Sequence, residues 1–153
     1  MSLDPQTRER LEKLLERQKL AALATQEANA PYLSLMAFTV AEDFKSLIIA
    51  TKRGTRKYTN IRNNPRVALL IDNRFEQRED FQNTLALTVI GTAREVEDKE
   101  RDVWASLFLK KHPDLGSFVN APECVLLRVD LERLLLVFRF EEVEELILTE
   151  KPL

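Results

Sequence analysis

The sequence predicts a mainly β protein, an antiparallel β-barrel with short peripheral helices. Seven or so strand-sized apolar runs follow one another closely along the chain. Helical patterns occur at only three places, whereas parallel strands would need a crossover helix after nearly every strand. Closing antiparallel strands into a barrel also removes exposed sheet edges. The chain has 153 residues, and residues 1–153 are therefore expected to form a single domain.

The N-terminal part predicts one helix and then a meander of strands. Asp4 and Pro5 favour a helix start, since an acceptor side chain caps the first turn and proline suits the first helical position. The helix is expected over about residues 5–19, as an N-terminal extension that packs over one end of the barrel. Strands are expected at 20–25, 32–38 and 47–51, with loops at 26–31 and 41–45.

The remaining elements follow from local start and stop signals. Thr55 can cap a short helix over residues 56–63, which Asn64 and Pro65 end. A strand at 84–95 contains Gly91, and glycine inside a strand indicates a bulge or barrel bend. Apolar periodicity predicts a helix over 97–112. The other strands are expected at 66–72, 124–129, 134–140 and 143–148.

Composition excludes several classes of protein. Hydrophobic residues make up 44% and charged residues 31% of the chain, a balance typical of a folded globular domain. No apolar run approaches the roughly 20 residues of a membrane helix. No secretory signal precedes the first helix, so a cytoplasmic location is expected. A single cysteine, Cys124, and a single histidine, His112, cannot supply an intrachain disulfide or a zinc cluster.

Positive charge is concentrated in one segment. Residues 45–71 contain seven basic residues and no acidic one. The whole chain has 23 basic and 25 acidic residues, so the rest of the sequence is strongly acidic. Such a concentration of charge suggests an anionic ligand.

The strongest functional signal is residues 50–57, ATKRGTRK. A strand ends at Thr51, glycine permits a tight turn, and a helix begins after Thr55. Backbone N–H groups and the positive end of the helix dipole then face a point that Arg56 and Lys57 can reach. This arrangement predicts a phosphate site, with a solvated basic face as the alternative. The glycine spacing of a nucleotide P-loop or a dinucleotide-binding fold is missing.

Five short segments share their order and spacing with a known protein family. They are 30–38 (APYLSLMAF), 49–51 (IAT), 55–57 (TRK), 60–67 (NIRNNPRV) and 88–94 (TVIGTAR). In this combination the chain resembles the pyridoxamine 5'-phosphate oxidase-like family of FMN-binding split-barrel proteins. The resemblance covers about residues 20–140. It implies a homodimer with two FMN molecules at its interface, and a flavin-dependent oxidoreductase that acts on an unidentified small substrate.

The resemblance also implies which residues hold the cofactor. The strand at 34–37 would run past the flavin ring, residues 50–51 would line it, and 55–57 match the family's Ser/Thr-Arg-Lys that grips the phosphate. The last assignment agrees with the helix-terminus argument. The flavin itself would carry any catalysis, so no catalytic residue is assigned. The implied cofactor-binding residues are Ser34, Leu35, Met36, Ala37, Ala50, Thr51, Thr55, Arg56 and Lys57.

The chain departs from the biosynthetic oxidases of this family at several positions. Ser34 and Ala86 stand where those enzymes carry an arginine and a glutamine at the flavin. Lys52 and Arg53 are candidates to replace the lost cofactor contacts. Trp104 stands where they carry a tyrosine that helps hold the substrate phosphate, so it is a candidate substrate or dimer contact. The C-terminal tail lacks their arginine and histidine, and vitamin B6 oxidase activity is not expected.

Other functions remain open at this point. The same fold can bind flavin without catalysis, or bind haem or a deazaflavin. His112 is expected to cap a helix end and offers only weak support for haem ligation, while Cys124 is expected in the core. A nucleic-acid-binding barrel would use the basic segment, but Tyr58 is its only aromatic residue, which leaves a stacking platform poorly supported.

Overall fold

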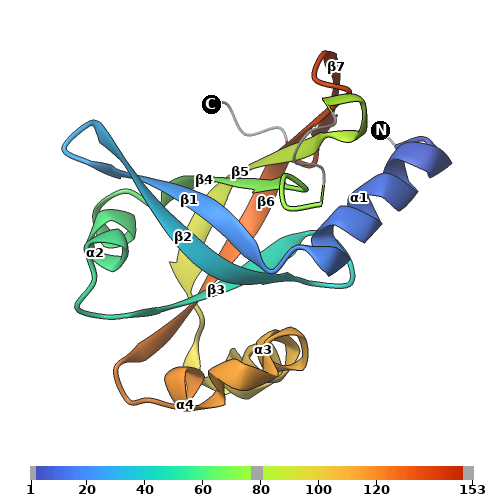
Figure 1. Cartoon of the computed structure of the whole chain (residues 1–153). Helices are drawn as coiled ribbons and strands as arrows, with labels where there is room; N and C mark the ends of the chain where they lie inside the picture. Colours follow the sequence, from blue (N-terminus) through green and yellow to red (C-terminus); the bar gives the residue numbers. More distant parts are fainter. Residues whose placement is uncertain (1–2, 77–80, 150–153) are drawn as a thin grey trace.

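In the part of the chain that the structure describes, seven antiparallel strands form one sheet, of which six close into a barrel (Figure 1). The computed structural model describes residues 3–76 and 81–149. The strand order is β3-β2-β1-β4-β5-β6-β7, and β3 also pairs with β6, which closes the barrel and leaves β7 as an edge strand. The predicted fold class is therefore confirmed. The elements are α1 (Pro5–Arg17), β1 (Leu20–Glu27), β2 (Ala30–Val40), β3 (Ser46–Lys52), α2 (Arg56–Asn63), β4 (Arg66–Asp72), η1 (Phe81–Asn83), β5 (Leu85–Glu95), α3 (Asp98–Lys111), η2 (Pro113–Leu115), α4 (Gly116–Val119), β6 (Cys124–Phe138) and β7 (Glu142–Ile147).

Helix α1 covers one end of the barrel (Figure 1). Asp4 caps it as predicted, because its carboxylate accepts hydrogen bonds from the backbone N–H groups of Gln6 at 2.9 Å and Thr7 at 3.2 Å. The helix ends earlier than expected, since Gln18 is already extended. Its apolar stripe is buried against the barrel interior, so the helix closes that end. Among the described residues, no helix has the length and apolar character needed to cross a bilayer.

The connection between β1 and β2 is tighter than the predicted loop over 26–31. Both strands continue to a two-residue turn at Ala28 and Asn29, whose φ angles are 48° and 67°. Two successive residues with positive φ match the twist of paired strands. The loop prediction was wrong because the polar residues flanking the turn still pair across the hairpin.

The two strands predicted at 124–129 and 134–140 are one strand, β6, and the predicted break at 130–133 was wrong. The residues between the two predicted strands are mostly charged, but their side chains have partners on neighbouring strands. Ser46 Oγ lies 3.3 Å from Asp130 Oδ1, and Thr92 Oγ1 donates to Glu132 Oε1 at 2.7 Å. These contacts let the polar segment continue as a strand between β3 and β5.

The bulge predicted at Gly91 is confirmed, because the register of β5 against β6 shifts between Ile90 and Gly91. The backbones approach closely at this point. A Cβ atom on Gly91 would lie 2.4 Å from the carbonyl oxygen of Asp130 and 2.9 Å from Val129 Cγ1. Only glycine fits here without movement of the backbone.

Gly91→Ala is expected to lower the free energy of unfolding by about 1–3 kcal/mol, the usual cost of forcing an extra methyl group into a packed site. Denaturant titration followed by circular dichroism measures this loss. Gly116→Ala is the matched control, since no atom lies within 4 Å of the added Cβ. Equal stability of the two variants would contradict the close approach of β5 and β6.

Strand β3 lies between two hydrophobic cores. Leu47 and Ile49 point into the barrel interior, whereas Ile48 and Ala50 pack outside the barrel against Phe108 of α3 and its neighbours. Residues 46–51 are consequently buried throughout. Strand β3 is thus the barrel strand against which α3 and α4 pack (Figure 1).

Lys111 links α3 to α1 and β2. Its Nζ donates to the carbonyl oxygen of Leu15 at 2.7 Å and lies 3.9 Å from the centroid of the Phe38 ring. Burial lowers the pKa of Lys111 from 10.5 to about 8, although Glu16 opposes that shift and Lys19 adds to it.

The stability that Lys111 contributes is expected to rise with pH between its folded and unfolded pKa values. In that window the unfolded chain binds more protons at this site than the folded protein, so the free energy of unfolding increases with pH. Denaturant titrations of the wild type and Lys111→Met at several pH values from about 7 to 10 test this expectation. The free energy of unfolding of the wild type should increase relative to that of Lys111→Met as pH rises. A difference that does not change with pH would contradict the expectation.

Candidate functional site

The barrel is split between β2 and β3. These strands pair only where Phe38, Thr39 and Val40 lie opposite residues 47–49, whereas β3 stays paired with β6 as far as Lys52. Residues 35–37 of β2 and 50–52 of β3 therefore have no ladder between them. Backbone N–H and C=O groups on an unpaired edge need other partners. The split leaves backbone hydrogen-bonding groups available to a ligand.

A cleft of about 300 Å³ lies at this split. The separated parts of β2 and β3 form one side, and the start of α2 adds polar groups at one end. The other side is apolar and comes from α3 and the short helical segments that follow it. The lining residues are Leu35, Met36, Ala37, Ala50, Thr51, Lys52, Thr55, Lys57, Phe108, Leu115 and Phe118.

Most of the residues predicted to bind a cofactor line this cleft, including all those at 35–37, 50–52 and both Thr55 and Lys57. Ser34, Arg53 and Arg56 do not line it. Ser34 Oγ is buried without a hydrogen-bond partner among the described residues. The structure thus brings the two halves of the proposed site together, while their roles toward a cofactor stay predictions.

The apolar wall was missed in the sequence analysis. Phe108 belongs to the apolar stripe of the predicted helix, which indicates burial but not the surface it faces. Leu115 and Phe118 lie in η2 and α4, which are too short to have a clear sequence pattern. Their position depends on packing against β3 and β6, so no local signal could have placed them at the cleft.

Thr55 occupies the N-cap position of α2, but the prediction that its side chain caps the helix was wrong. Its hydroxyl donates instead to the carbonyl oxygen of Lys52 at 2.8 Å and lies 3.0 Å from Thr51 Oγ1. The turn between β3 and α2 is held by these contacts. The first backbone N–H groups of α2 are left without a side-chain cap, which suits an anion near the helix start.

Three of the basic residues near the cleft have carboxylate partners from distant parts of the chain. The ion pairs are Lys52 with Glu123 at 3.6 Å, Arg53 with Glu95 at 2.8 Å and Arg56 with Glu27 at 3.6 Å. All three pairs are partly exposed and therefore contribute little stability. Lys57 has no ion pair within the described part of the chain, so it is the least compensated cation of the cleft.

Glu95 holds Arg53 away from the cleft. Tyr58 donates its hydroxyl to the Glu95 carboxylate at 2.8 Å, and Arg53 donates to the same carboxylate at 2.8 Å. Burial raises the pKa of Glu95, but the hydrogen bonds from Tyr58 and Arg53 outweigh it and hold the pKa below its ordinary value. Glu95 therefore stays ionised. Through its carboxylate, Arg53 and Tyr58 together connect the start of α2 to β5.

Trp104, His112 and Cys124 lie outside the cleft lining. The Trp104 ring packs under the Arg128 guanidinium, 5.4 Å from its centroid. Cys124 is buried as expected, and burial raises the pKa of its thiol. In residues 3–76 and 81–149, no group of three or more His, Cys, Asp or Glu side chains could hold a metal ion.

His112 is the C-cap residue of α3, as expected, and its backbone N–H donates to the carbonyl oxygen of Phe108. Its Nε2 lies 2.7 Å from the carbonyl oxygen of Phe38, so the ring links α3 to β2. Burial lowers the pKa of His112, which favours the neutral ring. A neutral ring bonded to a carbonyl through Nε2 donates that proton and cannot ligate haem iron through the same nitrogen.

Comparison with protein families decides the relationship of the chain. Residues 7–146 match the family model described as pyridoxamine 5'-phosphate oxidase. The chain belongs to this family. The match includes both sides of the split barrel and the basic turn before α2, so the cleft lies inside the pyridoxamine 5'-phosphate oxidase region. None of the curated proteins compared with the chain matches it.

Solved structures with the same fold include proteins with different names and ligands. The heme binding protein from Mycobacterium smegmatis has a TM-score of 0.83 and 13% identity, covering 95% of this chain and 60% of its own. General Stress Protein 26 from Bacillus anthracis has a TM-score of 0.71 and 23% identity, and the match covers 93% of this chain and 98% of the other. An FAD-binding protein from Mesorhizobium loti has a TM-score of 0.64 and 18% identity, and the match covers 86% of this chain and 92% of the other. At these identities, the likeness shows the pyridoxamine 5'-phosphate oxidase fold alone.

Proposed function

We propose that the protein is an FMN-binding flavoprotein of the pyridoxamine 5'-phosphate oxidase family, and that it oxidises or reduces a small molecule bound against the flavin. The observation that carries the proposal is the cleft at the β2–β3 split, where an unpaired backbone edge adjoins the start of α2. A flavin needs hydrogen bonds along the edge of its ring system and a cationic site for its phosphate. The cleft supplies both kinds of group.

The donor set of the cleft fits FMN better than an uncharged ligand. Lys57 and the uncapped start of α2 suit a phosphate dianion. Thr51 and Thr55 add hydroxyl groups at the same end. The backbone of β2 and β3 offers donors and acceptors, and the apolar wall around Phe118 excludes water from the ring. Each part of the cofactor thus has a matching part of the cleft.

A second copy of the chain would complete the site. One face of the sheet, outside the barrel, carries apolar side chains that lie opposite one another across β2, β1, β4, β5 and β6. Four leucines of this face are unusually exposed for apolar residues: Leu20 at 50%, Leu33 at 69%, Leu35 at 68% and Leu70 at 37%. We call this surface the outer apolar face; it consists of Leu20, Ala22, Ala24, Leu33, Leu35, Ala37, Ala68, Leu70, Thr88, Ile90, Leu135 and Val137.

The outer apolar face supports a homodimer with cofactors at the subunit interface. Exposed apolar surface of this extent marks an interaction site in a folded protein. Leu35 and Ala37 belong both to this face and to the cleft lining, so a partner seated on the face would border the cofactor. The cleft volume of about 300 Å³ is small for a whole cofactor site, in agreement with a site shared between two chains.

The chemistry would come from the flavin, which can accept and donate a hydride equivalent when bound. Among the described residues, the only titratable side chains in the cleft lining are Lys52 and Lys57. Both are cations that suit phosphate binding and charge stabilisation. The residues of this chain would therefore bind and orient the cofactor, exclude water along the apolar wall, and leave electron transfer to the flavin.

A visible absorption spectrum of the purified protein, with identification of the ligand released on denaturation, tests the proposal. A flavin spectrum, release of FMN and uptake of one FMN per chain are expected. Riboflavin, which lacks the phosphate, should bind more weakly than FMN. A haem spectrum, or no uptake of FMN, would overturn the proposal. Anaerobic mixing with reduced nicotinamides and small amines then tests for turnover, because a substrate would bleach the bound flavin.

A further inference from the structure

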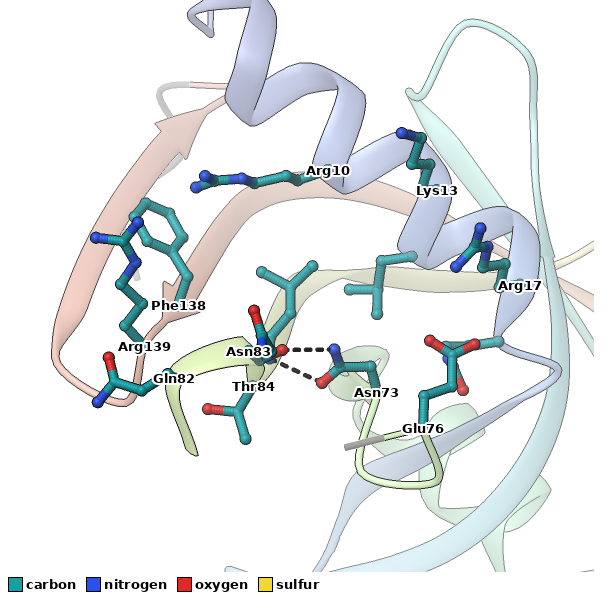
Figure 2. A pocket seen from close by; sticks show the side chains of 13 residues that line it. Arg10, Lys13, Arg17, Asn73, Glu76, Gln82, Asn83, Thr84, Phe138 and Arg139 are labelled. Carbon is teal, nitrogen blue, oxygen red and sulfur yellow. Dashed lines mark hydrogen bonds between the residues drawn. The ribbon is translucent and has the colours of Figure 1, made fainter. Parts of the chain in front are cut away.

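A second cleft lies at the opposite end of the barrel from the split, beside α1 (Figure 2). Its volume is about 300 Å³. Helix α1 forms one wall, and the opposite wall comes from residues 73, 76 and 82–85, which follow β4 and lead into β5, and from the end of β6. We call it the α1 cleft; its lining residues are Arg10, Lys13, Leu14, Arg17, Gln18, Asn73, Glu76, Gln82, Asn83, Thr84, Leu85, Phe138 and Arg139. None of these residues lines the cleft at the split.

The α1 cleft is strongly basic. Arg10, Lys13 and Arg17 are spaced three and four residues apart, so they share one face of the helix, and Arg139 faces them from the end of β6 (Figure 2). Glu76 is the single acidic residue of the lining within the described part of the chain. Like charges at this helical spacing are mildly destabilising. The arrangement is therefore unfavourable for α1 by itself and suits an anion in the cleft.

The cations of the cleft are only partly compensated by carboxylates. Within residues 3–76 and 81–149, Arg10 and Arg17 have no ion pair. Lys13 pairs with Glu9 at 2.5 Å, and Arg139 has a long contact of 3.5 Å with Glu142. Other positions of α1 are balanced, as the pair of Arg8 with Glu12 at 2.8 Å shows. The unbalanced charge is thus specific to the side of α1 that lines the cleft.

The fold restricts Arg10 and the wall of the cleft that faces α1. The Arg10 guanidinium lies 5.3 Å from the centroid of the Phe138 ring, which limits its freedom through a cation–π contact. Arg139 is the residue after Phe138, and its side chain lies across the cleft from α1 (Figure 2). The Asn73 side chain bonds the carbonyl oxygen of Asn83 at 2.9 Å and the N–H of Leu85 at 2.8 Å, which fixes the facing wall (Figure 2).

We infer that the α1 cleft binds a small anion that carries linked phosphate groups. The spacing of the cations carries this choice of ligand. Arg10 and Arg17 are seven positions apart, which corresponds to about 10 Å along a helix, and their side chains lie on different sides of the cleft (Figure 2). A short chain of linked phosphates can therefore place an oxygen near each guanidinium group, and arginine suits such oxygens because it binds two at once. The inference is independent of the proposed FMN site.

Isothermal titration of the full chain with inorganic tripolyphosphate, at constant ionic strength, tests the inference. The double variant Arg10→Gln/Arg17→Gln should bind tripolyphosphate at least about tenfold more weakly than the wild type. Arg8→Gln is the matched control, because it removes one positive charge from α1 outside the cleft lining. Orthophosphate should bind at least about tenfold more weakly than tripolyphosphate to the wild type. Lys45→Ala, which removes an exposed charge outside both clefts, should bind tripolyphosphate like the wild type.

Three results would overturn the inference. The first is a wild type that binds no tighter than the double variant. The second is an equal loss of affinity in Arg8→Gln, which would indicate attraction by overall charge. The third is equal affinity for orthophosphate and tripolyphosphate, which would exclude a site that spans several cations. Circular dichroism melting of each variant establishes that the binding comparison is made between folded proteins.

Discussion

Lys57→Ala is expected to lower the affinity of the protein for FMN by about ten- to a hundredfold, the usual loss when a charge-assisted hydrogen bond is removed. Lys57 lines the cleft at the split and has no ion pair among the residues that the structure describes. Lys52, by contrast, lies 3.6 Å from the Glu123 carboxylate. Quenching of flavin fluorescence measures the affinity. Riboflavin affinity should change much less, because riboflavin lacks the phosphate that Lys57 would contact.

Lys45→Ala is the matched control for this experiment. Lys45 belongs to the same basic segment but is exposed and lies outside the cleft lining, so its loss should leave FMN affinity nearly unchanged. Arg56→Ala should have a smaller effect than Lys57→Ala, since Arg56 does not line the cleft and pairs with Glu27 at 3.6 Å. An equal loss of FMN and riboflavin affinity in Lys57→Ala would place Lys57 away from the phosphate.

The sequence predicted best those elements that local signals define. Helix α2 and strand β4 have the expected bounds, Arg56–Asn63 and Arg66–Asp72, because Asn64 and Pro65 separate them unambiguously. Asp4 fixes the start of α1 in the same way. Gly91 indicated a bulge because glycine in a strand interior often occurs at a bulge, a bend or a close backbone approach. These signals depend on only a few neighbouring residues, so they can be recognised in the sequence without knowledge of the tertiary structure.

Features that depend on distant parts of the chain could not be predicted. Strand β6 continues through its polar residues because Asp130 and Glu132 find partners on β3 and β5. The loop between β1 and β2 is shorter than predicted because the two strands pair as far as the two-residue turn. In both cases, the sequence predicted irregular structure between two apolar runs. Pairing with neighbouring strands decided otherwise, which is the usual tertiary override of local preference.

The candidate site shows the same division. The basic turn at 52–57 and the strand at 35–37 are local signals, and the structure places both at one cleft. The charge of the site was overestimated, because Glu27, Glu95 and Glu123 are distant in sequence from the residues they neutralise. A count of charges along the chain cannot include partners that only folding brings near. The apolar wall formed by Phe118 and its neighbours was missed for the same reason.

Leu33→Glu/Leu70→Glu is expected to convert the proposed dimer to monomers. Both leucines lie on the outer apolar face, with 69% and 37% of their surface exposed in the single chain. A two-fold symmetric interface would bury the exposed part of four such side chains, and their loss removes roughly 3–6 kcal/mol of association free energy. The introduced carboxylates would also face an apolar partner. Sedimentation or light scattering measures the mass in solution.

Val103→Glu is the matched control, because Val103 is 71% exposed and lies on α3 rather than on the outer apolar face. It should leave the dimer intact, and its dissociation would place the interface elsewhere. Leu33 and Leu70 do not line the cleft at the split, so their substitution reaches the cofactor only through the partner subunit. FMN affinity should therefore fall together with dimer formation. A monomer that retains full FMN affinity would mean that one chain holds the whole cofactor, and the shared site would be wrong even if the dimer exists.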